Sequence, residues 1–218
     1  TDFRKADMDS FTMGPREIVT NGEFTSNINS WSTIAGAGSA AYTSTGNGRL
    51  RLNDFAAYQA INTTVNKTYK IQVRVLDTNS VGAALKVQVG TAAEGTQNLN
   101  TTLTVTNFRE GAILNTTFTA TAQTSYITLN NTVTTTNLDV DYVRISRSDI
   151  AHRKLAFVSY DNYLQSYKVT DDTNNSGNYS APLRIYILPD YATFGVSPRP
   201  NTNEYTISYN YYTTHTDL

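Results

Sequence analysis

The sequence predicts a mainly β protein in which an antiparallel jelly-roll β-sandwich is inserted into a small antiparallel sheet domain with one short helix. Three observations lead to this fold class. Apolar and polar residues alternate with a period of two through most of the chain, turn residues separate these runs at near-regular spacing, and helical periodicity appears in one stretch. Abundant Thr and Asn, together with 15 tyrosines, favour strands and turns over helices.

Length and charge narrow the classes of function. The 218 residues suffice for two domains. With 17 basic and 18 acidic residues the net charge is -1, which indicates neither a membrane surface nor a sequence-specific nucleic-acid partner. The chain has no cysteine, which excludes thiol catalysis and disulfides, and no apolar run approaches the ~20 residues of a membrane span.

The first 16 residues are more charged than those that follow, and Gly14-Pro15 ends them. They predict a short strand or arm, because so short a segment cannot bury enough surface to fold alone. The chain opens on Thr1 instead of an initiator Met, so we expect a processed product or the ordered part of a longer protein.

Residues 17–149 form a strand-rich block. Turn residues such as Asn130-Asn131 separate short alternating runs, which is typical of a sandwich or jelly roll. The polar stretch Gly90–Asn100 predicts a long loop. The expected strands are 38–43, 49–53, 58–63, 68–76, 83–89, 112–121, 125–129 and 138–146.

Residues 150–218 differ in character. Tyr160, Tyr163, Leu164 and Tyr167 recur at helical spacing after Ser159, a good N-cap residue, and predict the helix. A polar loop is expected over 170–180. Alternation over 183–187 and again over 204–211 then predicts strands of a small antiparallel sheet, with Pro198 and Pro200 in the turn between them.

Sequence motifs at the two ends of residues 17–149 resemble those of a known family. The block opens with Asn21-Gly-Glu-Phe24 followed by Trp31, and it closes with Leu138-Asp-Val-Asp-Tyr-Val-Arg-Ile145. These motifs resemble those of the jelly-roll carbohydrate-binding modules. The resemblance implies glycan binding without catalysis. Many of those modules hold a structural calcium at these ends, which here would fall on Glu23, Asp139 and Asp141. Thr25 and Tyr142 stand where those modules have two further carboxylates, so the calcium site is weakened.

Sugar binding requires exposed aromatic rings that stack on pyranose faces. The candidates are Tyr42, Tyr58 and Tyr126, with Phe55 and Tyr69 as further aromatic residues. Alternation places most of these aromatic residues, and Trp31, in the core, so core packing remains the alternative.

The tail carries a second resemblance. The tail contains, in order, an apolar strand, the Tyr-rich helical segment, a Gly-bearing loop, Pro182 before a strand and a Pro-x-Pro turn. This order resembles the head-to-tail adaptor proteins of short-tailed bacteriophages, and Asp2-Phe-Arg-Lys5 supplies their opening segment. The resemblance implies a structural virion protein at the head–tail junction, a homo-oligomeric ring whose partners are the portal protein and tail, nozzle or fibre proteins. Residues 1–16 and 150–218 would form its sheet domain. The jelly roll would project outward to dock fibres or contact host glycans.

An adaptor would use its tyrosines and arginines at subunit interfaces. The expected interface residues are Tyr160, Tyr163, Tyr167, Arg184, Arg199 and Tyr211. The same tyrosines suit a small domain core equally well, and the sequence does not decide between the two.

Catalytic patterns are weak. Neither His152 nor His215 has a spaced partner that forms a triad, and the acidic pairs Asp139/Asp141 and Asp171/Asp172 are spaced as in many structural strands and loops. We therefore predict that the protein is not an enzyme and has no cofactor beyond the calcium candidate. The leading interpretation is the phage adaptor, the alternative is an extracellular carbohydrate-binding module, and a glycan-active enzyme ranks last. Ring size and the identity of partners or glycans stay open.

Overall fold

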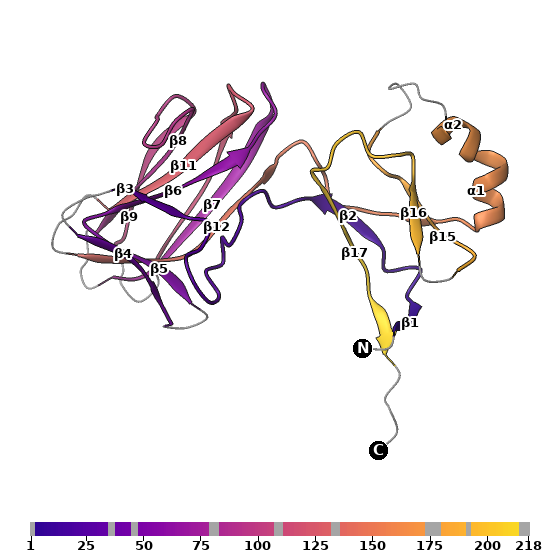
Figure 1. Ribbon diagram of the computed structural model, residues 1–218, viewed down its shortest axis with the longest axis horizontal. Helices are drawn as coiled ribbons and strands as arrows, with labels where there is room; N and C mark the ends of the chain where they lie inside the picture. Colours follow the sequence, from indigo (N-terminus) through magenta and orange to yellow (C-terminus); the bar gives the residue numbers. More distant parts are fainter. Residues whose placement is uncertain are drawn as a thin grey trace, which may run out of the picture. The chain divides into compact units, whose positions relative to one another are not determined.

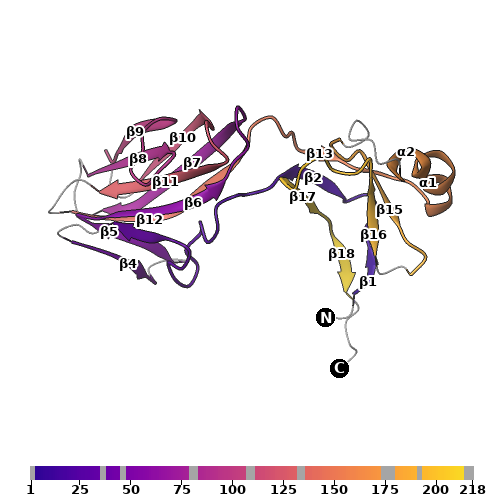
Figure 2. The same cartoon turned by 45° about the horizontal axis from the view of Figure 1, so that its top comes forward.

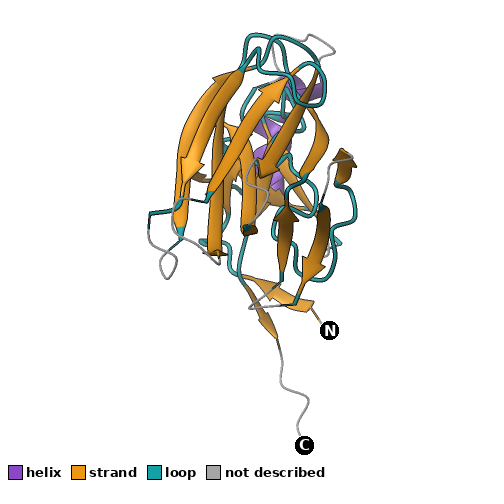
Figure 3. Ribbon diagram, turned by 90° about the vertical axis from the view of Figure 1, so that its left-hand side faces the viewer, coloured by secondary structure: helices purple, strands orange, loops and turns teal. Residues whose placement is uncertain are grey.

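The computed structural model of the protein is built mainly of strands (Figure 3). Among the described residues the helices are two and short, and neither has the length and apolar character needed to cross a membrane. The mainly β fold class is thus as predicted. The structure describes residues 3–34, 38–44, 48–78, 83–106, 111–131, 136–172, 180–190 and 193–213.

The chain divides into two compact units, and most of their strands are labelled in Figure 1 or Figure 2. One unit, here called the insert, is Glu17–Asp149, and the other, the terminal unit, combines Thr1–Arg16 with Ile150–Leu218. The two ends of the insert run side by side, because Ile18 N donates to Ile145 O at 2.9 Å. Neighbouring entry and exit points are what the insertion of one domain into a loop of another requires.

The insert is a sandwich of two five-stranded sheets in which all paired strands are antiparallel. The first, here called the arginine sheet, has the order β10-β7-β12-β5-β4, with β10 Ala112–Thr119, β7 Thr68–Thr78, β12 Asn137–Arg147, β5 Arg49–Asn53 and β4 Ser39–Thr43. The second, the tyrosine sheet, has the order β3-β6-β11-β8-β9, with β3 Ser32–Ile34, β6 Ala56–Asn62, β11 Thr124–Asn131, β8 Ala84–Gly90 and β9 Leu99–Thr104.

The core of the insert lies between the sheets and follows from strand alternation. In β7 the residues at 69, 71, 73 and 75 are fully buried, whereas those at 70, 72 and 74 between them reach the outward side. Residues 85, 87 and 89 of β8 face them from the other sheet. Trp31, expected in the core, is 7% exposed, and its Nε1 donates to Asn21 O at 3.3 Å.

The predicted strands of the insert all appear, with ends shifted by a few residues. Two strands were missed, β3 and β9, and the end of β9 nearest Leu99 falls in the stretch 90–100 that we expected to be a loop. Both are polar strands at the edges of the tyrosine sheet. Edge strands bury few side chains, so they leave little apolar alternation in the sequence.

The terminal unit contains three small sheets. Strands β13 Arg153–Lys154, β2 Thr12–Pro15 and β17 Tyr205–Ser208 form one, and β14 Ala156–Phe157, β15 Arg184–Ile187 and β16 Phe194–Ser197 form another. A two-stranded sheet joins β1 Phe3–Ala6 to β18 Tyr211–Thr213. The tail strands that we expected in one antiparallel sheet are therefore divided, and β14 pairs with β15 in parallel. Their shared core contains Phe11, Met13, Ile150, Leu155 and Ile185.

The predicted helix is present as α1, Tyr160–Ser166, and Ser159 caps it by accepting a hydrogen bond from Asn162 N at 3.3 Å. A second helix, α2 Lys168–Asp172, was not predicted and overlaps the expected loop 170–180. It follows α1 directly, because Asp171 N donates to Tyr167 O at 3.0 Å and continues the helical path past the break at Tyr167.

Candidate functional site

Two tyrosines lie together on the outward side of the tyrosine sheet. Tyr58 on β6 and Tyr126 on β11 alternate with core residues of the same strands, so both point away from the core. Thr128 pairs with Tyr58 and Tyr126 pairs with Ala60, which makes the tyrosines diagonal neighbours. Their ring centroids are 6.2 Å apart at an interplanar angle of 43°, and both side chains are partly exposed.

Polar side chains surround this tyrosine pair. The strand register places one outward residue of each strand in a row across the sheet, running Ser32, Tyr58, Thr128, Gln88, Asn100. The next outward row, two residues further along each strand, contains Asn130 and Lys86. The outward side therefore combines aromatic rings with amide and hydroxyl groups.

The loop that follows β8 packs over part of this side. Glu94 N donates to Thr128 Oγ1 at 2.9 Å, and Gln88 Nε2 donates to Glu94 O at 3.0 Å. Asn130 Nδ2 reaches Glu94 Oε1 at 3.5 Å. The loop buries Gln88 and Thr128, whereas Tyr58 and Tyr126 stay partly exposed beside it. Sequence reasoning missed these polar residues, because only the strand register reveals them.

Tyr42, the third glycan candidate, lies elsewhere. It is on β4 of the arginine sheet, opposite the buried Leu50, and its hydroxyl donates to Thr25 O at 3.3 Å. Its side chain is 36% exposed at the sheet edge. Tyr69 is fully buried and accepts a hydrogen bond from Thr64 N, as core packing predicts.

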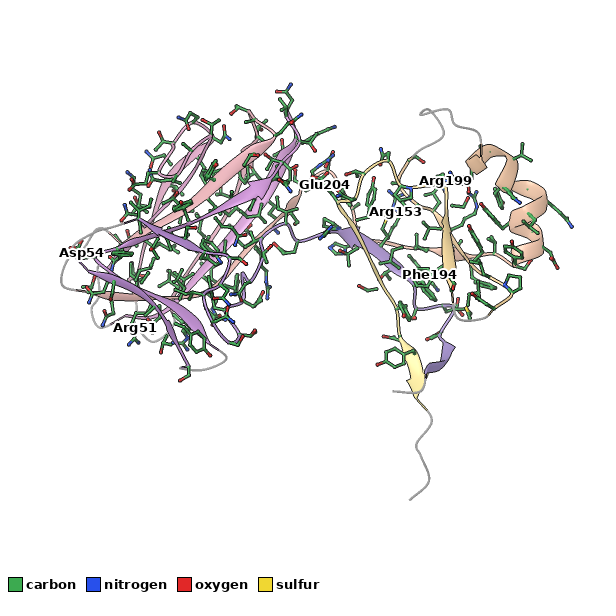
Figure 4. The ribbon with its side chains drawn as sticks, in the orientation of Figure 1. Arg51, Asp54, Arg153, Phe194, Arg199 and Glu204 are labelled. Atoms are coloured by element: carbon green, nitrogen blue, oxygen red, sulfur yellow. The ribbon has the colours of Figure 1, made fainter. Side chains whose placement is uncertain are left out.

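The three calcium candidates do not converge. Glu23 binds Arg144 at 2.6 Å, and this hydrogen bond raises the pKa of Arg144 above its usual value. Asp139 accepts two hydrogen bonds from Arg51, at 2.7 and 2.8 Å (Arg51 is labelled in Figure 4). Asp141 lies 3.5 Å from Arg74 NH1.

No three His, Cys, Asp or Glu side chains of the described residues gather into a metal-binding group. Calcium requires six to eight oxygen ligands, and these carboxylates are each neutralised by arginine instead. In the described part of the chain the three predicted calcium ligands therefore pair with arginines and do not form one site.

The acidic pairs and histidines in which the sequence showed only weak catalytic patterns lie on several different elements. Asp139 and Asp141 each pair with arginine, and Asp171 is buried in α2. His152 is exposed, with its ring packed against Gly14. His215, and the side chain of Asp172, lie outside the described residues.

Four of the six predicted interface residues make ring contacts within the terminal unit, and of these four Tyr163 is buried while the others are half-buried. Tyr163 stacks on Tyr186 with ring centroids 3.7 Å apart, and Tyr160 lies 6.3 Å from Tyr163. The guanidinium of Arg184 lies 4.2 Å from the centre of the Tyr167 ring. Tyr186 was not among the predicted residues, because in the strand alternation it occupies the side of the polar Arg184.

The remaining two interface candidates lie on the surface. Tyr211 is 50% exposed, with its ring centroid 6.5 Å from that of Tyr209. Arg199, labelled in Figure 4, is also exposed, and its carbonyl accepts a hydrogen bond from Ser180 N at 2.9 Å.

No protein-family model matches the sequence, and no curated protein matches it. A candidate sugar-binding protein from Bacteroides thetaiotaomicron aligns with 61% of this chain and 100% of its own, with a TM-score of 0.50 and 8% identity. The module CBM1 of BiXyn10A aligns with 61% of this chain and 99% of its own (TM-score 0.49, 16% identity). The module CBM36, solved with calcium and xylotriose, aligns with 56% of this chain and 98% of its own (TM-score 0.42, 16% identity). The first likeness, at a TM-score of 0.50, is one of fold, and with the antiparallel sheets of the insert it agrees with the predicted jelly-roll sandwich.

Proposed function

We propose that the insert is a non-catalytic module that binds glycan chains on the outward side of the tyrosine sheet. The observation that carries the proposal is the pair Tyr58 and Tyr126, which presents aromatic rings beside amide and hydroxyl side chains. Aromatic rings stack on the C–H faces of sugars, and amide groups bind their hydroxyls. The likeness to the sugar-binding protein is one of fold, so the argument depends on these side chains.

The arrangement favours a chain of sugars over a single sugar. The row from Ser32 to Asn100 crosses five strands, and neighbouring strands lie about 4.8 Å apart, so the row spans about 19 Å. The exposed polar side chains of this row are Ser32 at one end and Asn100 at the other, because the loop after β8 covers Thr128 and Gln88 between them. A glycan chain lying beside this loop would contact the two rings and the exposed polar groups around them at once.

Titration of the full chain with neutral oligosaccharides tests this proposal. In calorimetry with xylohexaose, cellohexaose and a galactotriose, we expect at least one to bind with a Kd between about 1 mM and 1 μM. The double variant Tyr58→Ala/Tyr126→Ala should weaken that binding at least about tenfold. The matched control is Tyr42→Ala, which removes a partly exposed tyrosine from the other sheet and should leave the Kd unchanged. Equal losses in both variants, or binding that survives the double variant, would contradict the proposal.

A second candidate function concerns the terminal unit, where we propose an adaptor that joins portal and tail proteins in a virion. The specific observation in its favour is that the two end segments of the chain combine into one compact unit. The segments that resemble phage adaptors, 1–16 and 150–218, are the ones that form it. Under this proposal the exposed Tyr211 and Arg199 contact neighbouring subunits of a homo-oligomeric ring, and the insert faces outward to fibres or host glycans.

The mass of the native protein tests the adaptor proposal. Light scattering should give an assembly several times heavier than the 24.1 kDa chain, because ring subunits associate head to tail. Tyr211→Ala should shift the assembly toward smaller species. A protein that stays monomeric at every concentration would contradict this candidate and leave the glycan-binding proposal intact.

A further inference from the structure

The outward side of the arginine sheet concentrates charge on three adjacent strands. Arg49 and Arg51 of β5, Asp139 and Asp141 of β12, and Arg74 of β7 form what we call the arginine block. Register explains the grouping, since Arg51 pairs with Asp139, and a bulge at Asp141 places its side chain between Arg49 and Arg74.

The two carboxylates of the block differ in how they pair with the arginines. Asp139 is 1% exposed and is held by both donors of the Arg51 fork, so that pair is locally neutral. Asp141 is shared, with Arg49 Nε at 3.9 Å and Arg74 NH1 at 3.5 Å. These separations are longer than good charge-assisted hydrogen bonds, and one carboxylate faces two guanidinium groups. The block therefore carries three positive and two negative charges.

Arg74 is the member that is available to a ligand. Its side chain is 38% exposed and that of Arg49 is 12% exposed, whereas Arg51, at 41%, has both donors of its fork bound to Asp139. Arg74 Nε is buried and makes no hydrogen bond within the described part of the chain. A buried donor without an acceptor is uncommon in folded proteins, so it needs an explanation. Here the explanation is that the Arg74 side chain is oriented to bind a ligand. Tyr142 lies directly opposite Arg74, with the Arg144 guanidinium 4.3 Å from its ring centre, and Gln72 lies on the same side of β7.

We propose that the arginine block binds the monovalent oxyanion of an acidic glycan, a uronate carboxylate or a sulfate ester, through Arg74. One such anion balances the surplus charge of the block, and a guanidinium fork matches its oxygens. The sequence resemblance placed a cation at Asp139 and Asp141, but the arginines around them favour an anion instead. The inference rests on the proposed glycan binding of the insert for its choice of ligand class, and it adds a second site on the opposite sheet.

Calorimetry with the full chain tests the inference, with trigalacturonate, a κ-carrageenan tetrasaccharide, whose acidic groups are all sulfate esters, and neutral xylotriose as probes. At least one acidic probe should bind, more weakly as salt increases, and Arg74→Gln should lower its affinity at least about tenfold. Asp141→Asn removes the competing carboxylate and should raise the affinity. The control Arg153→Gln removes a half-buried arginine of the terminal unit and should have no effect.

The results of this calorimetry distinguish binding at the arginine block from binding at the tyrosine sheet. Binding of trigalacturonate alone identifies the carboxylate as the ligand group, binding of the sulfated probe alone identifies the sulfate, and either supports the site. The inference is overturned if neither acidic probe binds, or if Arg74→Gln and Asp141→Asn leave the affinity unchanged. It is also overturned if Tyr58→Ala/Tyr126→Ala abolishes acidic binding, a result that would support the tyrosine sheet as the only site.

Discussion

Arg51→Met is expected to lower the free energy of unfolding of the insert by about 3–5 kcal/mol, because it leaves a buried charge without its partner. Asp139 is 1% exposed, and Arg51 provides two hydrogen bonds to its carboxylate. Methionine keeps much of the side-chain packing and removes the charge. Urea unfolding followed by Trp31 fluorescence measures the effect, since the only tryptophan of the chain lies in the core of the insert.

Arg144→Met is the matched control. Arg144 also pairs with a carboxylate of the same unit, that of Glu23. Glu23 is 51% exposed, so water can solvate its carboxylate once Arg144 is replaced. The expected loss is below about 1 kcal/mol. Similar losses in the two variants would contradict the assignment of Arg51 and Asp139 as a structural pair.

Tyr163→Ala is expected to destabilise the terminal unit by about 3–5 kcal/mol, the usual cost of removing a large buried aromatic side chain. Tyr163 is 7% exposed and stacks on Tyr186 with an interplanar angle of 13°. The stack joins α1 to β15, so its loss should loosen the helix from the sheet. Circular dichroism should show an earlier unfolding transition, whereas Trp31 fluorescence, which reports on the separate core of the insert, should stay unchanged.

Tyr211→Ala provides the comparison for a surface tyrosine of the same unit. Tyr211 is 50% exposed, so its removal should change the stability by no more than about 0.5 kcal/mol. The pair of variants separates core packing from subunit contact. If Tyr163→Ala left stability unchanged and dissociated an oligomer, Tyr163 would be an interface residue and the packing assignment would be wrong.

Local sequence patterns predicted the elements that bury one face. The alternation in 68–76 became β7, and the helical spacing after Ser159 became α1, because in both segments packing against the core agrees with local preference. The polar edge strand β9 and the five-residue helix α2 bury little and left no such pattern.

The candidate sites depend on register, which local patterns do not contain. Arg51 and Asp139 are 88 residues apart, and only the pairing of β5 with β12 brings them together. Composition pointed to tyrosines as glycan candidates, but the sheet order decides that Tyr58 and Tyr126 form a pair and that Tyr42 lies on the other sheet. The arginines that neutralise the expected calcium ligands were invisible for the same reason.

Mapping a bound oligosaccharide by NMR tests the central claim most directly. Titration of the isotopically labelled full chain with the best neutral oligosaccharide should shift amide resonances of β6 and β11 around Tyr58 and Tyr126, and of the neighbouring Gln88 and Asn130. Shifts confined to the terminal unit or to the arginine sheet, or no shifts at millimolar ligand, would contradict glycan binding on the tyrosine sheet.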